Sequence, residues 1–294
     1  MILVTGSTGQ LGSCFQQLSK GNPSTDFLFA DSEVLDISDK KCVQRFFMEH
    51  QNIEWVINCA AYTAVDKAES EPEKARQANV KGVKNLAEAC AACGATLIHF
   101  STDYVYHSRQ NTPFEESDSV SPKSVYGSSK LAGERAAFKV YPQGTMVIRT
   151  SWVYSPYGHN FVKTMLRLGA GRDSLNVVSD QIGTPTYAPD LAAAVMQIIH
   201  QVESADVSKE KIAGIWHYSN EGVASWYDFA VAIFELSHLK CRVSPIKTSD
   251  YPTPARRPPF SVLSKSKIKA TFHLDIPHWR QSLEVCLKEM DEKV

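Results

Sequence analysis

The stretch that decides the fold is Ile2-Leu3-Val4-Thr5-Gly6-Ser7-Thr8-Gly9-Gln10-Leu11-Gly12. A short strand-forming run leads straight into glycines at every third position, and an amphipathic run follows over 10–18. In a strand–turn–helix unit, Gly6 permits the tight turn, Gly9 allows backbone to approach a diphosphate, and Gly12 allows the helix to pack on the strand. The N-terminus of that helix offers free N–H groups to the phosphates. The stretch therefore predicts a dinucleotide site at the start of a Rossmann unit.

Beyond this unit, β-rich runs alternate with amphipathic runs as far as Thr150. We expect strands at Phe27–Ala30, Trp55–Cys59, Thr96–Ser101 and Met146–Thr150, and helices at Ser38–His50, Pro72–Cys93 and Val125–Val140. Ser38 is the expected N-cap of its helix, and Gly94 the expected stop of the helix that precedes it. The alternation predicts an α/β fold, a doubly wound parallel sheet with helices on both faces.

After Thr150 the alternation breaks down, because prolines and aromatic residues cluster at 152–157, 183–189 and 251–259. We expect helices at Phe161–Leu168, Pro189–Gln201, Trp226–Leu236 and Pro277–Met290, and a strand at Ile215–Tyr218. Residues 1–150, with about 189–218 returning, are expected to form the Rossmann domain. Residues 151–188 and 219–294 are expected to form a smaller substrate-binding domain, since irregular segments beside a sheet commonly carry binding loops.

Composition excludes several classes of function. The 294-residue chain has a net charge of −1, so nothing indicates nucleic acid as a partner. Apolar runs such as Leu191–Ile199 are far shorter than the roughly 20 residues that span a bilayer. The seven cysteines and the absence of a signal-like start favour reduced thiols and a cytoplasmic location, and Cys90-Ala-Ala-Cys93 has no second pair beside it. No histidine spacing indicates a metal site.

A candidate catalytic group lies at Tyr126-Gly-Ser-Ser-Lys130, where Tyr and Lys share one face of the expected helix. A nearby ammonium should lower the tyrosine pKa from its ordinary value of about 10 and let the phenol exchange a proton with a carbonyl oxygen. The strand expected before it ends in Ser101-Thr102, and a hydroxyl at such a strand end can hydrogen-bond the same oxygen. Thr102 and Ser101 are both candidates for that hydroxyl.

A candidate ribose contact is Asp31, which follows the expected second strand. A carboxylate there can accept hydrogen bonds from an adenosine ribose, which favours NADH. No Arg or Lys lies beside it to bind a 2′-phosphate. A solvated loop aspartate would fit the same pattern, so both NADPH and NADH stay open.

These motifs, with several longer ones, make the chain similar to the extended short-chain dehydrogenase/reductases, and more narrowly to the dTDP-4-dehydrorhamnose reductase family. The resemblance rests on the opening glycines and on the segments 58–71, 101–105, 126–134, 149–154, 160–165, 180–186, 225–227 and 251–258. The motif at 58–71 reads Asn-Cys-Ala-Ala-Tyr-Thr-Ala-Val-Asp-Lys-Ala-Glu-Ser-Glu. Motifs of this length are specific to the family.

The resemblance implies reduction of the C4 ketone of dTDP-4-dehydro-L-rhamnose by NADPH or NADH. It assigns catalysis to Thr102, Tyr126 and Lys130, with Tyr126 as the proton donor and Lys130 on the nicotinamide ribose. The implied cofactor contacts are Gly6, Gly9, Gln10, Leu11, Gly12, Asp31, Asp36, Ile37, Ala60, Tyr62, Thr63, Ala64, Tyr126 and Lys130. The implied sugar contacts are Thr102, Asp103 and Trp152, whose indole can stack on a sugar ring. Arg257 is a candidate for the diphosphate because guanidinium groups bind phosphate bidentately.

Two departures from the family pattern matter. Some family members are dimers bridged by magnesium through glutamates, but this chain carries Cys14, Pro189 and Ser266 at or near those positions. We therefore expect a monomer or a weak homodimer without a bridging metal. The family usually has Phe after the Tyr-Val that follows Thr102-Asp103, whereas this chain reads Tyr106-His-Ser-Arg109. That change leaves open an alternative in which the chain is a sibling reductase that makes another dTDP-deoxysugar.

Three further alternatives differ in function. A nucleotide-sugar 4,6-dehydratase carries Asp-Glu after its threonine, and Tyr104 at that point cannot replace the carboxylate; a 4-epimerase stays open. The regulatory subunit of methionine adenosyltransferase also resembles this family, so a non-catalytic dinucleotide-binding subunit is an alternative. The intact Thr, Tyr and Lys group favours the enzyme.

Overall fold

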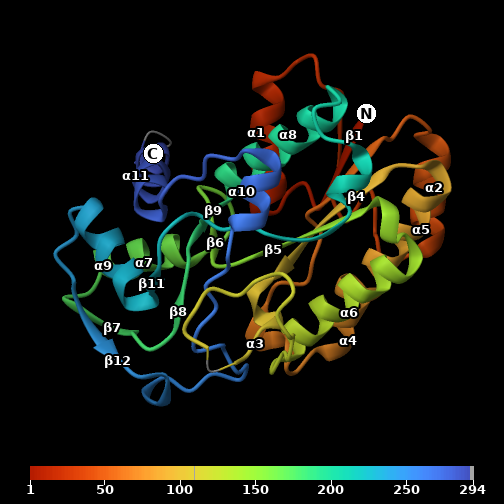
Figure 1. Cartoon of the computed structure of the whole chain (residues 1–294). Helices are drawn as coiled ribbons and strands as arrows, with labels where there is room; N and C mark the ends of the chain where they lie inside the picture. The colour runs from red at the N-terminus through yellow and green to blue at the C-terminus, as the bar shows by residue number, and fades with distance from the viewer. Residues whose placement is uncertain (109, 292–294) are drawn as a thin grey trace.

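A parallel six-stranded sheet forms the centre of the computed structural model, which describes residues 1–108 and 110–291 (Figure 1). Its strand order is β2 (Phe27–Ala30), β1 (Ile2–Thr5), β3 (Trp55–Asn58), β4 (Thr96–Thr102), β5 (Thr145–Thr150) and β10 (Gly214–His217). The chain winds outward from β1 to β2 and then returns to the other side of β1 with β3. Ligands of such sheets bind beyond the carboxyl ends of the strands at this reversal. The predicted Rossmann-like fold is confirmed.

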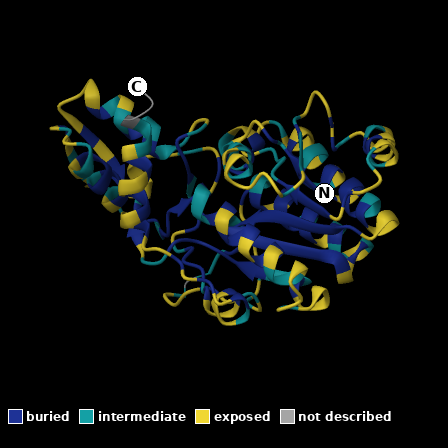
Figure 2. Cartoon of the chain, turned by 90° about the horizontal axis from the view of Figure 1, so that it is seen from above, coloured by how far each residue is buried: buried dark blue, intermediate teal, exposed yellow. Residues whose placement is uncertain are grey.

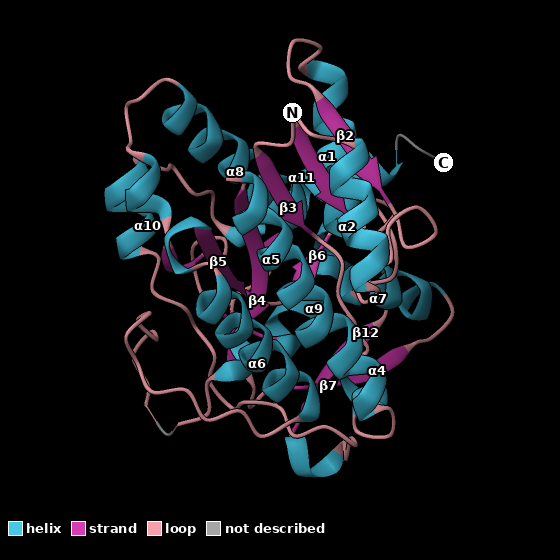
Figure 3. Cartoon of the chain, turned by 90° about the vertical axis from the view of Figure 1, so that its right-hand side faces the viewer, coloured by secondary structure: helices cyan, strands magenta, loops and turns pink. Residues whose placement is uncertain are grey.

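Alternating side chains divide the hydrophobic core between the two faces of the sheet. Ile2 and Val4 lie with α1 (Gln10–Gly21), α8 (Ala188–Glu203) and α10 (Ser266–Phe272). Leu3, between them, lies on the opposite face, which α2 (Lys40–Glu49), α5 (Val83–Cys93) and α6 (Val125–Val140) cover (Figure 3). Every residue of β1, β3, β4 and β5 is buried, and the strands of the sheet are largely dark blue in Figure 2. Burial on both faces requires nearly continuous apolar strands.

Helix boundaries differ from expectation in two places. The cap of α2 is Asp39, whose carboxylate accepts from the N–H of Lys41, so the prediction of Ser38 was wrong by one residue. The helix expected over 72–93 is divided into α4 (Pro72–Arg76), a π-helical segment at Gln77–Gly82, and α5. Gly94 ends α5 with a φ of 77°, the left-handed conformation that glycine adopts without strain.

A second hydrophobic core lies beside the sheet. It is formed by α7 (Phe161–Ala170), α9 (Trp226–Leu236), α11 (Trp279–Asp291) and a parallel pair of strands, β7 (Ser174–Val178) and β12 (Arg242–Ile246) (Figures 1 and 2). Short pairs join β6 (Val153–Tyr154) to β9 (Thr186–Tyr187), and β8 (Ile182–Gly183) to β11 (Ala224–Ser225). Helix α10 packs on the central sheet, although its residues lie within the range expected for the smaller domain. In the described part of the chain, no helix is both long and apolar enough to cross a membrane.

Candidate active site

The glycine loop between β1 and α1 has the geometry of a phosphate cradle. Gly6 has a φ of 61°, and a Cβ there would lie 2.6 Å from the backbone nitrogen of Ala60 at the end of β3. A Cβ on Gly12 would collide with the carbonyl of Gly6. Gly9 caps α1 without a side-chain hydrogen bond, so the first N–H groups of the helix keep their capacity to donate to an anion.

A cavity of about 500 Å³ opens beside this loop, at the reversal between β1 and β3. Five of the expected cofactor residues line it: Gly6, Gly9, Asp36, Ile37 and Ala60. The remaining walls come from residues before α2 and from the segment around α4. The free helix N-terminus, the close glycine turn and the adjoining cavity fit a dinucleotide.

Other expected cofactor residues lie around the cavity with partners of their own. Asp31 follows β2, and its Oδ1 accepts from the N–H groups of Glu33 and Val34. The amide oxygen of Gln10 accepts from Ser155 and Asn160, so this side chain connects the glycine loop to the smaller core. Leu11 and Gly12 lie in the first turns of α1.

The segment that follows β3 carries three more of the expected cofactor contacts. Tyr62 is held at its backbone N–H by Asn79 and at its hydroxyl by Glu71. Thr63 and Ala64 are exposed directly before the short helix α3 (Val65–Ala68).

The three expected catalytic residues converge at the carboxyl end of β4. Thr102 ends that strand next to Tyr126, which lies in the first turn of α6, and the Thr102 hydroxyl donates to Oδ1 of Asp103 at 3.1 Å. Ser124 caps this helix through the N–H of Gly127, and Lys130 follows one turn after Tyr126. The alternative hydroxyl, Ser101, instead donates to the carboxylate of Glu134. The geometry therefore favours Thr102 over Ser101.

The structure does not agree with the expectation that Lys130 lowers the pKa of Tyr126. Burial raises the pKa of Tyr126 to about 12, against a smaller lowering by Thr102. Burial also lowers the pKa of Lys130 to about 8, and Glu134 opposes this. Desolvation, which disfavours the charged form of each group, is the largest cause of both pKa shifts.

Sequence reasoning missed two rows of buried polar side chains beneath this site. Thr5, Asn58 and His99 occupy one register across β1, β3 and β4, and Ser101, Arg149 and His217 occupy another across β4, β5 and β10. All six are less than 5% exposed. The sequence did carry a signal for these residues, because each is a polar residue near the end of a strand at a position that should face the core.

The second row is tied to α6 by a buried ion pair. The guanidinium of Arg149 donates to both carboxylate oxygens of Glu134, at 3.0 and 2.6 Å, and to the hydroxyl of Tyr106 at 2.6 Å. Tyr106 lies 2.8 Å from Nε2 of His217. Tyr106 is fully buried, so this departure from the family pattern lies in the core; Arg109 lies outside the described residues.

The expected sugar contacts lie nearby, and each side chain already has partners within the protein. Asp103 is buried beside Thr102, and burial raises its pKa to about 6. Trp152 has a positive φ of 47°, and its ring stacks on Trp226 with centroids 3.6 Å apart, so one face of the indole is already covered. Arg257 is held by Asp66 at 2.8 and 3.0 Å and by Thr253. A phosphate contact by Arg257 would require it to share or leave the Asp66 carboxylate.

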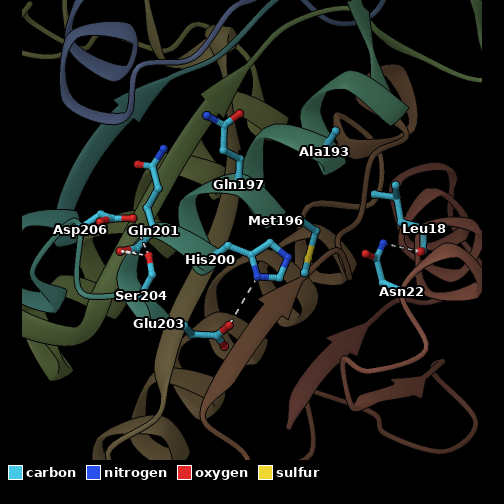
Figure 4. Close-up of a pocket in the computed structure, with 10 residues that line it drawn as sticks. All are labelled: Leu18, Asn22, Ala193, Met196, Gln197, His200, Gln201, Glu203, Ser204 and Asp206. Carbon is cyan, nitrogen blue, oxygen red and sulfur yellow. Dashed lines mark hydrogen bonds and ion pairs between the residues drawn. The ribbon is translucent and has the colours of Figure 1, made fainter.

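A larger hollow of about 680 Å³ lies elsewhere, between the last turns of α1 and α8 (Figure 4). Its lining includes Leu18, Asn22, Met196 and His200. These residues lie at the helix ends remote from the glycine loop and from the carboxyl ends of the strands. The hollow therefore has no part in the site described above.

Comparison with known proteins agrees with this geometry. The family model described as "RmlD substrate binding domain" matches residues 1–292. A dTDP-4-dehydrorhamnose reductase from Aggregatibacter actinomycetemcomitans is 40% identical over 291 residues, which are 96% of this chain and 97% of the relative. The chain belongs to the dTDP-4-dehydrorhamnose reductase family.

Solved structures of the dTDP-4-dehydrorhamnose reductase family share the whole fold. A reductase from Clostridium acetobutylicum has a TM-score of 0.92 at 40% identity and covers 99% of both chains. A reductase from Bacillus anthracis, solved in complex with NADP, has a TM-score of 0.90 at 37% identity and covers 98% of both. Among residues 1–108 and 110–291 of the present chain, no three His, Cys, Asp or Glu side chains are grouped to hold a metal.

Proposed function

We propose that this protein reduces the C4 ketone of dTDP-4-dehydro-L-rhamnose to dTDP-L-rhamnose, with NADPH or NADH as reductant. The observation that carries the proposal is the convergence of Thr102, Tyr126 and Lys130 beside the dinucleotide cavity, in a chain that matches reductases of this specificity over nearly its full length. Residues 151–188 and 219–294 would supply the nucleotide-sugar side of the site.

Each residue of the group has a separate role in the reduction. A bound reduced nicotinamide supplies the hydride that C4 receives. Tyr126 would donate its phenolic proton to the C4 oxygen, and the neighbouring Thr102 hydroxyl would hydrogen-bond the same oxygen and hold the ketone in place. Lys130 would bind the nicotinamide ribose from the next turn of α6. The N–H groups at the start of α1 would bind the diphosphate of the dinucleotide.

Three observations bear on the alternatives. The phenol of Tyr104 stands where a 4,6-dehydratase needs a carboxylate, and burial raises its pKa, so it cannot act as a base at C5. The altered residue Tyr106 is fully buried and its hydroxyl accepts from Arg149, so this part of the change lies in the core, which weakens the case for a sibling deoxysugar. An intact catalytic group argues against a non-catalytic regulatory subunit.

The proposal includes a cytoplasmic monomer or weak homodimer without a bridging metal. Cys42, Cys59, Cys90, Cys93 and Cys241 form no disulfide, which supports a reducing compartment. Cys14 is buried in α1, and Pro189 and Ser266 offer no carboxylate to a metal.

The experiment is a reductase assay with dTDP-4-dehydro-L-rhamnose made in situ by the dehydratase and epimerase that precede this step, with NADPH and NADH in parallel. We expect oxidation of the dinucleotide that depends on this protein, and dTDP-L-rhamnose as the product by NMR. Dinucleotide binding without oxidation would favour the regulatory alternative, and a different C4 epimer would favour the sibling reductase.

A further inference from the structure

A chain of hydrogen bonds runs beneath the catalytic group and ends at Lys130. It starts at Thr5 on β1, passes through Asn58 on β3 and His99 on β4, and reaches the Nζ atom of Lys130 at 3.4 Å from Nε2 of His99. These side chains occupy one register of the sheet, on the face that α6 covers. None is more than 2% exposed, so bulk water does not contribute partners.

The direction of this chain is fixed by a backbone group. The N–H of Ala60 donates to Oδ1 of Asn58 at 3.1 Å, and the hydroxyl of Thr5 donates to the same oxygen at 2.8 Å. A backbone N–H cannot accept a hydrogen bond, so turning the Asn58 amide over would set two donors against each other. The NH2 group of Asn58 therefore faces Nδ1 of His99, at 3.0 Å.

That orientation determines the tautomer of His99. Nδ1 must accept from Asn58, so the single proton of the neutral ring sits on Nε2 and points at Lys130. A doubly protonated ring would oppose the NH2 group of Asn58. An ammonium carries donors only, whereas a neutral amine has a lone pair that can accept the Nε2 proton.

We propose that His99 is a positioning residue, which donates from Nε2 to Lys130 and thereby favours the neutral amine over the ammonium in the enzyme without bound dinucleotide. Among the described residues, no second hydrogen-bond partner faces the Nζ atom. The hydrogen bond from His99 to Lys130 does not depend on the proposed function. Its effect on catalysis rests on the proposed function, because it requires that Lys130 acts together with Tyr126.

The charged groups around Lys130 come from three directions. Glu134, one turn further along α6, favours the ammonium, but its carboxylate is already bound by Arg149 of β5 and by Ser101 of β4. Tyr126 and Asp103 lie near each other at the end of β4. Burial disfavours the charged form of each side chain and raises its pKa. Burial lowers the pKa of His99 well below its ordinary value, so its ring is neutral at pH 7, and burial lowers the pKa of Lys130 to about 8, so the neutral amine is reached at a lower pH than in free lysine.

The decisive variant is Asn58→Asp. One carboxylate oxygen would still accept from Ala60, and the other would face Nδ1 of His99 and require the ring proton there. Nε2 would then accept from the Lys130 ammonium. The matched control is Thr5→Val, which removes one donor to Asn58 but leaves the Ala60 N–H that fixes the amide.

Two NMR measurements on the whole protein test the inference without using activity. Proton–nitrogen spectra of the histidine rings report the His99 tautomer, with His99→Leu assigning its signals. A titration of lysine labelled at Cε reports Lys130, with Lys130→Met assigning it.

We expect the wild type and Thr5→Val to show an Nε2–H ring and a Lys130 midpoint near pH 8. We expect Asn58→Asp to show an Nδ1–H ring and a midpoint higher by about 1 pH unit or more. An Nδ1–H ring in the wild type, or a wild-type lysine that titrates at its ordinary pKa, would overturn the inference whether or not the protein reduces the sugar. Because the wild type alone can give either result, the test does not depend on the folding of Asn58→Asp.

Discussion

The substitution Tyr106→Phe tests the buried network beneath the site, because it removes one oxygen and restores the residue usual in the family. The Tyr106 hydroxyl accepts from the Arg149 guanidinium at 2.6 Å and lies 2.8 Å from Nε2 of His217. A hydrogen bond to a charged group contributes about 1.5–3 kcal/mol, and a neutral one about 1 kcal/mol. Arg149 keeps its two bonds to Glu134, so the loss is limited to the hydroxyl.

We therefore expect Tyr106→Phe to lower the free energy of unfolding by roughly 2–4 kcal/mol. Urea denaturation at pH 7 without dinucleotide measures it. The control is Tyr251→Phe, at a side chain 60% exposed, which should stay within about 0.5 kcal/mol of the wild type. If Tyr106→Phe also stays within that margin, the hydroxyl is not a required partner of Arg149 and the reasoning is refuted.

Three further predictions concern the site itself. Tyr126→Phe should lower turnover by roughly 100-fold or more while dinucleotide affinity, measured by calorimetry, is unchanged; near-normal turnover would exclude Tyr126 as the proton donor. Asp31→Ala should reduce any preference for NADH over NADPH in the ratio of kcat/KM values, and an unchanged ratio would count against a ribose contact. Asp103→Asn should stabilise the protein at pH 7, because burial raises the folded-state pKa from 3.8 to about 6 and the charged form is disfavoured. In the wild type the folded state then binds more protons than the unfolded state between these two pKa values. The gain in free energy of unfolding of Asp103→Asn over wild type should therefore be absent below about pH 4, grow up to about pH 6 and then level off at roughly 3 kcal/mol. A gain that is independent of pH in urea denaturation would contradict this.

The sequence allowed the sheet and the proximity of Thr102, Tyr126 and Lys130 to be predicted for local reasons. The glycines at 6, 9 and 12 act within a single strand–turn–helix unit, and Tyr126 and Lys130 are neighbours on one helix. Thr102 could be expected at a strand end because the strand before it is apolar. Each of these inferences needs only nearby residues.

What was missed depends on contacts between distant segments. His99 and Asn58 become partners only because β3 and β4 pair in one register, and Arg149 meets Glu134 only because α6 packs over β5. The paired residues of β7 and β12 are 68 positions apart in the sequence, and the two strands contain polar residues and Pro245, so neither run has a strand pattern of its own. The pKa of Tyr126 could not be predicted because it depends on burial, which the spacing to Lys130 does not report.

The most direct test of the proposed reaction follows the transferred atom. Reduced dinucleotide deuterated at C4 of the nicotinamide, in each of its two positions separately, would be supplied with dTDP-4-dehydro-L-rhamnose and the purified protein. The proposal predicts dTDP-L-rhamnose with deuterium at C4 of the sugar from one of the two labelled forms and none from the other. Product without deuterium at C4 from either form, or no product although the dinucleotide binds, would contradict it.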